Sequence, residues 1–215
     1  MLRIFTSLFI ALGLALPLTA CAEDGHAPYA AGTHYQVLDN PVPVADPTKV
    51  EVREFFSYTC PHCFETEVLV SEWKATAPAD VNFVQTHVTF LRNAEPLARA
   101  FYIADAKGML DKTHQPLFDA IHKHREPLFT VPALANFYRK YGLDPKEFNE
   151  LYASFGVSTK VRQADALSRD YGITGVPSFA VNGKYLILRS NLKNNLETFK
   201  VIDYLVAKER KTLGQ

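Results

Sequence analysis

Two cysteines lie three residues apart where an apolar, strand-like run gives way to a helical pattern. The run covers residues 50–57, and the motif that follows it is Cys60-Pro61-His62-Cys63. Pro61 suits the first position of a helix, because the N–H that it lacks would have no partner there. A thiol pair at this spacing can cycle between dithiol and disulfide. The motif therefore predicts a strand followed by a helix that begins at a redox-active pair.

The surroundings of the first cysteine favour its thiolate. A helix N-terminus concentrates partial positive charge on its free N–H groups, and His62 can add a full positive charge at neutral pH or below. We therefore expect the pKa of Cys60 to lie below its ordinary value. Cys63, one turn further along, should be better buried and should resolve the adducts of Cys60. A stabilised thiolate stabilises the reduced form, which predicts an oxidant.

Two other uses of the pair stay open. One is a static disulfide, although a small ring at a helix start suits exchange better than bracing. The other is half of a zinc site, which needs two more ligands. Cys21 is the only other cysteine, and His122 and His124 do not share a helix face. We therefore expect no metal ion and no organic cofactor.

Composition narrows the class of protein. The chain has 215 residues, enough for one large domain or for one domain with an insertion. Its 23 basic residues balance its 23 acidic ones. The sequence has neither a basic stripe nor an acidic tail, so its charge gives no reason to expect nucleic acid as a partner.

Residues 1–22 are predicted to be an export signal. The apolar run at 8–16 is short for a membrane span. Two processing routes stay open: small residues at 20–22 suit cleavage of a soluble protein, and residues 18–21 equally resemble a lipoprotein signal in which Cys21 is lipidated. A buried N-terminal helix is a third interpretation. Both processing routes lead to an oxidising compartment, where a disulfide persists.

Hydrophobic periodicity divides the rest of the chain into three parts. Strands predicted at 50–57 and 81–88 flank a helix at about 60–77, which gives a parallel crossover unit. Residues 91–157 then show helical spacing only. Strands return at 178–181 and 185–188, joined by Asn182-Gly183, a strong hairpin signal. The order is β–β–α–β, helices, α–β–β–α, with a short first strand at 34–38 and a last helix at 196–208.

Within these helices, apolar faces and caps can be assigned. We expect Phe64, Val68, Leu69 and Trp73 on the buried side of the helix at 60–77. Asp144 is expected to cap a helix whose buried side carries Phe148, Leu151, Tyr152 and Phe155. Ser158 is expected to cap the next helix, which ends at Tyr171.

A second motif, Gly175-Val176-Pro177, precedes the hairpin. A proline that opens a strand is by itself an edge or turn device. Together with the cysteine motif, it resembles the thioredoxin superfamily and, more closely, the DsbA family of bacterial disulfide oxidants. The matching residues are 54–63, 175–177 and 181–185. Cys-x-x-Cys alone indicates only the superfamily, whereas the Pro-His pair inside it is more specific.

The resemblance extends from about Thr33 to the C-terminus and implies the fold. This is an α/β, thioredoxin-like fold with an inserted all-helical domain. Residues 33–90 and 158–215 would form the catalytic domain, and residues 91–157 would form the insertion, a lid over the active site.

The resemblance also implies roles for the motif residues. Cys60 would be the surface nucleophile, with a strongly depressed pKa, and Cys63 would resolve mixed disulfides. Val176-Pro177 would be a cis peptide beside them, and the Val176 backbone would pair with an extended substrate segment.

The implied activity is that of a monomeric, periplasmic thiol:disulfide oxidoreductase, soluble or anchored through Cys21. It would donate the Cys60–Cys63 disulfide to reduced, newly exported proteins and be re-oxidised by a quinone-linked membrane partner of the DsbB type. Two alternatives remain: a disulfide isomerase or reductase, and a peptide-binding, chaperone-like module with a structural disulfide. Isomerases of the superfamily carry an extra N-terminal dimerisation domain, whereas about thirty exported residues precede the first strand here.

Glu54 is a candidate proton-transfer group. Strand alternation puts it on the apolar face of Val50, Val52 and Phe56, where burial would raise its pKa and let it relay protons to Cys63. A twist of the strand end into solvent is the alternative. Some relatives place a lysine that pairs with this acid where this chain has Gln85. His87, on the same strand, is expected to be a packed, hydrogen-bonded residue.

Overall fold

The computed structural model describes residues 27–214, with a five-stranded sheet at the centre of the fold. The strand order is β1-β5-β4-β2-β3. Strands β2 and β3 are parallel, and the other neighbouring pairs are antiparallel. The strands are β1 (Tyr35–Val37), β2 (Val50–Phe56), β3 (Val81–His87), β4 (Ser178–Val181) and β5 (Tyr185–Ile187). Helix α1 (Pro61–Thr76) is the crossover between β2 and β3, as the sequence predicts.

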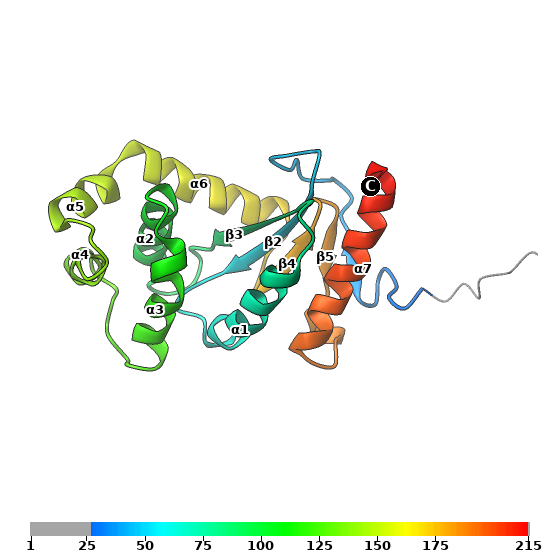
Figure 1. The fold of residues 1–215 in the computed structure, drawn as a ribbon, viewed down its shortest axis with the longest axis horizontal. Coiled ribbons are helices and arrows are strands. Elements are labelled where there is room, and N and C mark those ends of the chain that lie inside the picture. Colours follow the sequence, from blue (N-terminus) through cyan, green and yellow to red (C-terminus); the bar gives the residue numbers. More distant parts are fainter. Residues whose placement is uncertain (1–26, 215) are drawn as a thin grey trace, which may run out of the picture.

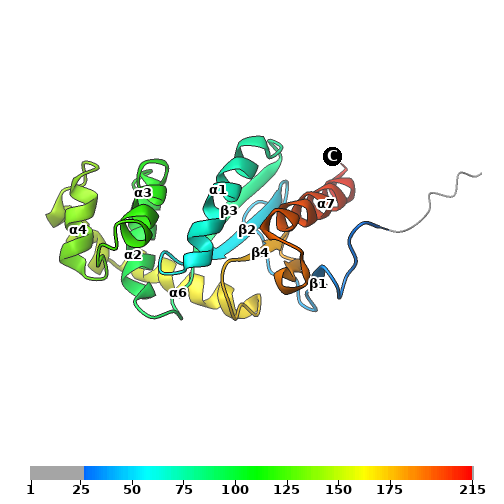
Figure 2. The ribbon, with the colours of Figure 1, turned by 90° about the horizontal axis from the view of Figure 1, so that it is seen from below.

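Helices cover both faces of this sheet (Figures 1 and 2). Helices α1 and α7 (Asn195–Leu213) lie on one face, and part of α6 (Phe155–Asp170) lies on the other. Side chains of β2 alternate accordingly: Val50 and Val52 join the cluster with α7, whereas Phe55 packs against Tyr171 on the α6 face. Burying each such side chain favours folding by about 1.5–3 kcal/mol. Strand β2 therefore contributes buried side chains to the packing on both faces of the sheet.

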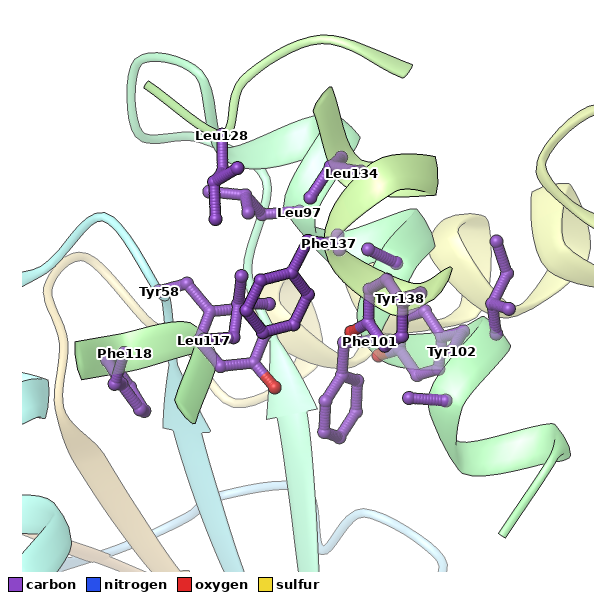
Figure 3. Packing of buried hydrophobic residues seen from close by; sticks show 14 of the residues in the cluster. Tyr58, Leu97, Phe101, Tyr102, Leu117, Phe118, Leu128, Leu134, Phe137 and Tyr138 are labelled. Carbon is purple, nitrogen blue, oxygen red and sulfur yellow. The ribbon is translucent and has the colours of Figure 1, made fainter. Parts of the chain in front are cut away.

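The residues between β3 and β4 form a helical unit beyond one end of the sheet (Figure 1). Its helices are α2 (Ala94–Ala106), α3 (Leu110–His122), α4 (Val131–Arg139), α5 (Pro145–Ala153) and the first part of α6. The core of this unit reaches the end of β2, where Tyr58 is fully buried and its ring lies 4.8 Å from that of Phe118 (Figure 3). The helical unit and the sheet therefore share packing at the point where the cysteine motif begins.

The predicted hairpin between β4 and β5 is confirmed. Asn182 and Gly183 both have positive φ, 51° and 66°, as a tight two-residue turn requires. The Val42 N–H donates to the Gly183 carbonyl over 2.8 Å. A Cβ on Gly183 would lie 1.9 Å from the Val42 carbonyl oxygen, so only glycine fits there.

The predicted cap of α6 is wrong. Ser154, not Ser158, caps this helix and accepts from the Val157 N–H over 3.2 Å. Because α5 ends at Ala153, this one serine separates two helices, and Phe155 begins the second instead of extending the apolar side of the first. Phe155 is 80% exposed. Helix α6 therefore runs across the domain boundary predicted at 157/158.

One face of α1 also differs from the expectation. Val68 is 58% exposed, and the buried residues of the helix are Cys63, Thr66, Glu67, Val70 and Trp73. The apolar pattern misplaces this face because the buried side carries a threonine and a glutamate.

No helix within residues 27–214 is both long and apolar enough to cross a membrane. The predicted export signal, including Cys21, lies outside the described residues.

Candidate active site

The cysteine motif forms the first turn of α1. Cys60 is the N-cap residue, with extended backbone angles, and Pro61 follows in the first turn. The Cys63 N–H donates to Cys60 Sγ over 3.2 Å, so the first thiol also caps the helix. Both thiols are free, and Cys60 is 6% exposed whereas Cys63 is fully buried. Cys60 is therefore the more accessible of the two, although it is less exposed than the surface position that the resemblance implies.

The two thiols differ sharply in their tendency to ionise. The pKa of Cys60 falls from its ordinary value of 9.0 to about 6, mainly because the Cys63 thiol hydrogen-bonds to it. Burial opposes this shift, while the backbone N–H groups of Cys63 and His62 and the charge of His62 support it. Burial, followed by the interactions with Cys60, raises the pKa of Cys63. The expected direction for Cys60 is confirmed, but its largest cause is the second cysteine.

His62 makes a smaller contribution than its place in the motif suggests. Its side chain is exposed, and Nδ1 lies 3.2 Å from a carboxylate oxygen of Glu65, one turn along the helix. The His62 ring therefore interacts with the Glu65 carboxylate as well as with Cys60.

The Gly175-Val176-Pro177 segment lies against the first cysteine. The Val176–Pro177 peptide is cis, as expected, and the Cys60 thiol donates to the Val176 carbonyl over 3.4 Å. Beside them opens a cleft of about 620 Å³. It is lined by Thr59, Cys60, Pro61, Leu91, Arg92, Asn93, Phe129, Gly175 and Val176. Residues from the sheet domain and from the helical unit thus meet at the more accessible thiol.

Glu54 is fully buried, so the alternative in which the strand twists it into solvent is wrong. Gln85, its neighbour on β3, donates to one carboxylate oxygen over 2.8 Å. The other oxygen has no hydrogen-bond partner among the described residues. Burial and then the charge of Glu67 raise the pKa of Glu54 to about 8. Glu54 is also close enough to Cys63 to raise the pKa of that thiol.

Two groups near Glu54, namely Glu67 and His114, were not foreseen from the sequence. His114, from α3, lies with Nε2 3.3 Å from the Gln85 amide nitrogen and 3.3 Å from a Glu67 carboxylate oxygen. Its Nδ1 lies 2.7 Å from the Tyr58 hydroxyl. These side chains lead to a second cleft, of about 400 Å³, which Glu67, Gln85 and His114 help to line.

The signals for these two groups differ. Glu67 follows Cys63 by four residues on one helix, a spacing that places both on one face. His114 lies in a different helix, and no local pattern connects it with Glu54.

The remaining histidines within the described part of the chain are not grouped as metal ligands. His87 is fully buried and packed, as predicted: it accepts from the Tyr58 N–H over 3.1 Å and hydrogen-bonds the Val88 carbonyl over 2.8 Å. Burial lowers its pKa to about 3. The ring of His122 stacks on Phe64. Within residues 27–214, no three histidine, cysteine or acidic side chains are grouped as metal ligands.

Comparison with known proteins places this arrangement in a family. Residues 70–199 match the model of the DSBA-like thioredoxin domain. The thiol:disulfide interchange protein DsbA of Pseudomonas aeruginosa is 35% identical over 210 residues, which cover 98% of each chain. The chain belongs to the DsbA family. The DsbA of Burkholderia cepacia is 37% identical and covers 96% of each chain.

Solved structures agree with this assignment to the DsbA family. The crystal structure of Pseudomonas aeruginosa DsbA matches 87% of this chain and 97% of its own, with a TM-score of 0.81 and 36% identity. The oxidoreductase DsbA from Xylella fastidiosa matches 85% of this chain and 98% of its own, with a TM-score of 0.80 and 32% identity. The expected thioredoxin-like fold and the expected thiol:disulfide oxidoreductase activity are therefore confirmed. The family-model match begins after Cys63, so the roles of individual residues rest on the geometry of the site.

Proposed function

We propose that this DsbA-family protein oxidises protein thiols by giving up a Cys60–Cys63 disulfide. The observation that carries the proposal is the asymmetry of the pair: Cys60 has a lowered pKa and lies at a cleft, whereas Cys63 is buried and has a raised pKa. A thiol of low pKa is a good leaving group and a stable thiolate, and both properties favour transfer of the disulfide to a substrate.

The cycle follows from this asymmetry. A substrate thiolate attacks Sγ of Cys60 and breaks the Cys60–Cys63 bond, and the sulfur of Cys63 leaves and takes up a proton. A second substrate thiol then loses its proton and attacks the substrate sulfur of the mixed disulfide. Cys60 leaves as a thiolate, the substrate gains a disulfide, and the enzyme holds two more electrons.

Val176 and Pro177 are the proposed substrate-binding residues. The Val176 backbone lies beside the reacting sulfur at the wall of the cleft. An extended substrate segment would pair with it through main-chain hydrogen bonds, which suit many different sequences. Pro61 and His62 shape the first turn of α1 and support the thiolate.

Glu54 is the proposed proton-transfer group for Cys63. Its pKa of about 8 lets it hold or release a proton near neutral pH. Gln85, Glu67 and His114 link it to the second cleft, through which the proton would exchange with solvent.

The compartment and partners belong to the same proposal. The clients are reduced, newly exported proteins, and the protein is a monomer in the periplasm. A quinone-linked membrane protein of the DsbB type would restore the disulfide. Whether the mature chain is soluble or lipidated at Cys21 is decided by its intact mass.

The division of the chain into units is also a proposal. Residues 33–90 and 158–215 would be the catalytic domain, and 91–157 the inserted domain. Helix α6 joins the two and packs on both.

A trapping experiment tests the cycle. Without the resolving thiol, Cys63→Ala incubated with proteins carrying an activated disulfide should accumulate covalent adducts through Cys60, seen as reducible bands on non-reducing gels. Cys60→Ala is the matched control and should form far fewer adducts, because Cys63 is buried. A peptide-binding module would give equal, low levels for both variants, and that result would overturn the proposal.

A further inference from the structure

Arg189 is a half-buried cation that no sequence pattern connects with the active site. It begins the short 3-10 helix Arg189–Asn191, which follows β5 and precedes α7. Its position in the chain is distant from the cysteine motif, and the proposed cycle assigns it no role.

The contacts of Arg189 join the substrate-binding segment to α7. One terminal nitrogen, Nη1, donates to the Pro177 carbonyl over 2.7 Å, and Nη2 donates to the Asn195 side-chain oxygen over 2.7 Å. Nε is buried and has no partner among the described residues. The planar guanidinium fork therefore holds the carbonyl that follows the Val176–Pro177 peptide against the first residue of α7.

The charge of Arg189 also lies close to the reacting groups. Burial lowers its pKa, while the anionic forms of Cys63, Glu54 and Cys60 each act to raise it. Burial and the charge of Glu67 still raise the pKa of Glu54, and the charge of Arg189 opposes that rise. Three side chains of α1, those of His62, Glu67 and Lys74, also act on Cys60 or on Glu54.

We propose that Arg189 is a positioning residue for disulfide exchange: it fixes Val176-Pro177 beside Cys60 and holds a permanent positive charge next to the dithiol. The proposal rests on the proposed function, in which Cys60 and Cys63 exchange disulfides. The Arg189 cation favours the Cys60 thiolate and therefore the reduced enzyme. Arg189 thus makes the Cys60–Cys63 disulfide easier to transfer to a substrate. The guanidinium of Arg189 stays charged at all working pH values.

Two substitutions separate the tether from the charge. Arg189→Gln removes the charge, and its amide is too short to replace Nη1 and Nη2. Arg189→Lys keeps the charge and one donor but loses the fork that joins the Pro177 carbonyl to Asn195. Arg210→Gln is the matched control, because Arg210 lies on α7 and pairs instead with Asp80 over 2.6 Å. All four proteins are compared by thermal unfolding, thiolate absorbance against pH, and equilibration with glutathione.

We expect Arg189→Gln to raise the pKa of Cys60 and to shift the glutathione equilibrium about tenfold towards the disulfide form, or about 30 mV for this two-electron couple. Arg189→Lys should recover most of that equilibrium but bind an extended model peptide several-fold more weakly, because a single ammonium no longer joins the Pro177 carbonyl to Asn195. Arg210→Gln should match the wild type in every redox readout. Wild-type values for the folded Arg189→Gln variant would overturn the proposal, and so would an equal shift in both Arg189 variants. Neither outcome would affect disulfide exchange by the wild type.

Discussion

At the scale of single residues, the low pKa of Cys60 is the property on which the proposed transfer of the disulfide depends. The sequence identified its helix N-terminus and His62 as causes. The structure adds the Cys63 thiol as the largest one and reveals Glu65 beside His62. The direction of the pKa shift could be predicted because one turn of a helix has a known geometry. The order of its causes could not, because it depends on the hydrogen bond between the two cysteine side chains.

The order of these causes leads to a first prediction. Thiolate absorbance of reduced wild-type protein should titrate at about pH 6. His62→Ala should raise the midpoint slightly, because the charge of His62 is the smallest of the causes that lower the pKa of Cys60. Cys63→Ala should move it further, because it removes the largest cause.

The exposed His124 provides the control for this titration. His124→Ala should leave the midpoint unchanged. A larger effect of His62→Ala than of Cys63→Ala would contradict this order of causes.

Glu54 leads to a prediction about stability and pH. Its folded-state pKa of about 8 lies above the ordinary value of 4.5, so the folded protein loses stability as pH rises from about 4.5 through 8. Glu54→Gln still accepts from Gln85 but does not ionise. By urea unfolding of the oxidised protein, the variant should match the wild type at pH 4 and be more stable above pH 8, by up to about 5 kcal/mol.

An exposed acid on α1 serves as the comparison. Glu72→Gln should show the same pH dependence as the wild type, because Glu72 is in contact with solvent. A constant difference between Glu54→Gln and the wild type at every pH would show that Glu54 does not titrate as described.

Of the proposed proton-transfer neighbours of Glu54, Gln85 could be predicted from the sequence and His114 could not. Burial of Glu54 follows from alternation along a strand, and its pairing with position 85 is implied by the resemblance to the DsbA family. His114 comes from a helix in the inserted unit, and its approach to Gln85 depends on how α3 packs against the sheet. No periodicity carries that information.

At the scale of elements, hydrophobic periodicity predicted nearly every helix and strand but misplaced one helix start. Ser154 ends α5 and begins α6, and a break of a single residue leaves the apolar spacing almost continuous. Phe155 therefore resembled one more core residue of α5, although it lies in solvent. Caps, which depend on backbone angles, decide such a boundary better than apolar spacing does.

The two serines allow a direct test of this boundary. Ser154→Ala should lower the free energy of unfolding by about 1 kcal/mol, because the Val157 N–H loses its partner. Ser158→Ala should have an effect of less than about 0.5 kcal/mol, since Ser158 lies inside α6 and its hydroxyl accepts from Arg99 instead of capping the helix. Urea unfolding of both variants supplies the comparison. A larger loss of unfolding free energy in Ser158→Ala than in Ser154→Ala would show that Ser158 is the cap.

At the scale of the whole molecule, the site is assembled from four distant stretches of chain. The motif at 60–63, the segment at 175–177, and residues 91–93 and Phe129 of the helical unit all contribute to the cleft at Cys60. The sequence predicted the first two and the presence of an insertion. It did not predict which insertion residues reach the cleft, because packing of the unit around Tyr58 sets its position.

The same assembly explains why distant elements act on one redox equilibrium. Helix α1 supplies both thiols and the N–H groups that favour the Cys60 thiolate, and the connection before α7 supplies the Arg189 cation. Strand β2 supplies Glu54, whose pKa of about 8 keeps it mostly protonated, and so uncharged, beside the dithiol at neutral pH. We therefore predict a disulfide that is less stable than those of thiol reductants.

Equilibration of the Cys60–Cys63 pair with a glutathione redox buffer measures this stability. We predict a reduction potential above about −180 mV, the value for protein disulfide isomerase, so that the pair oxidises most protein thiols. A potential near about −270 mV, as in thioredoxin, would contradict the proposed direction of transfer, because such a pair reduces disulfides instead of donating one.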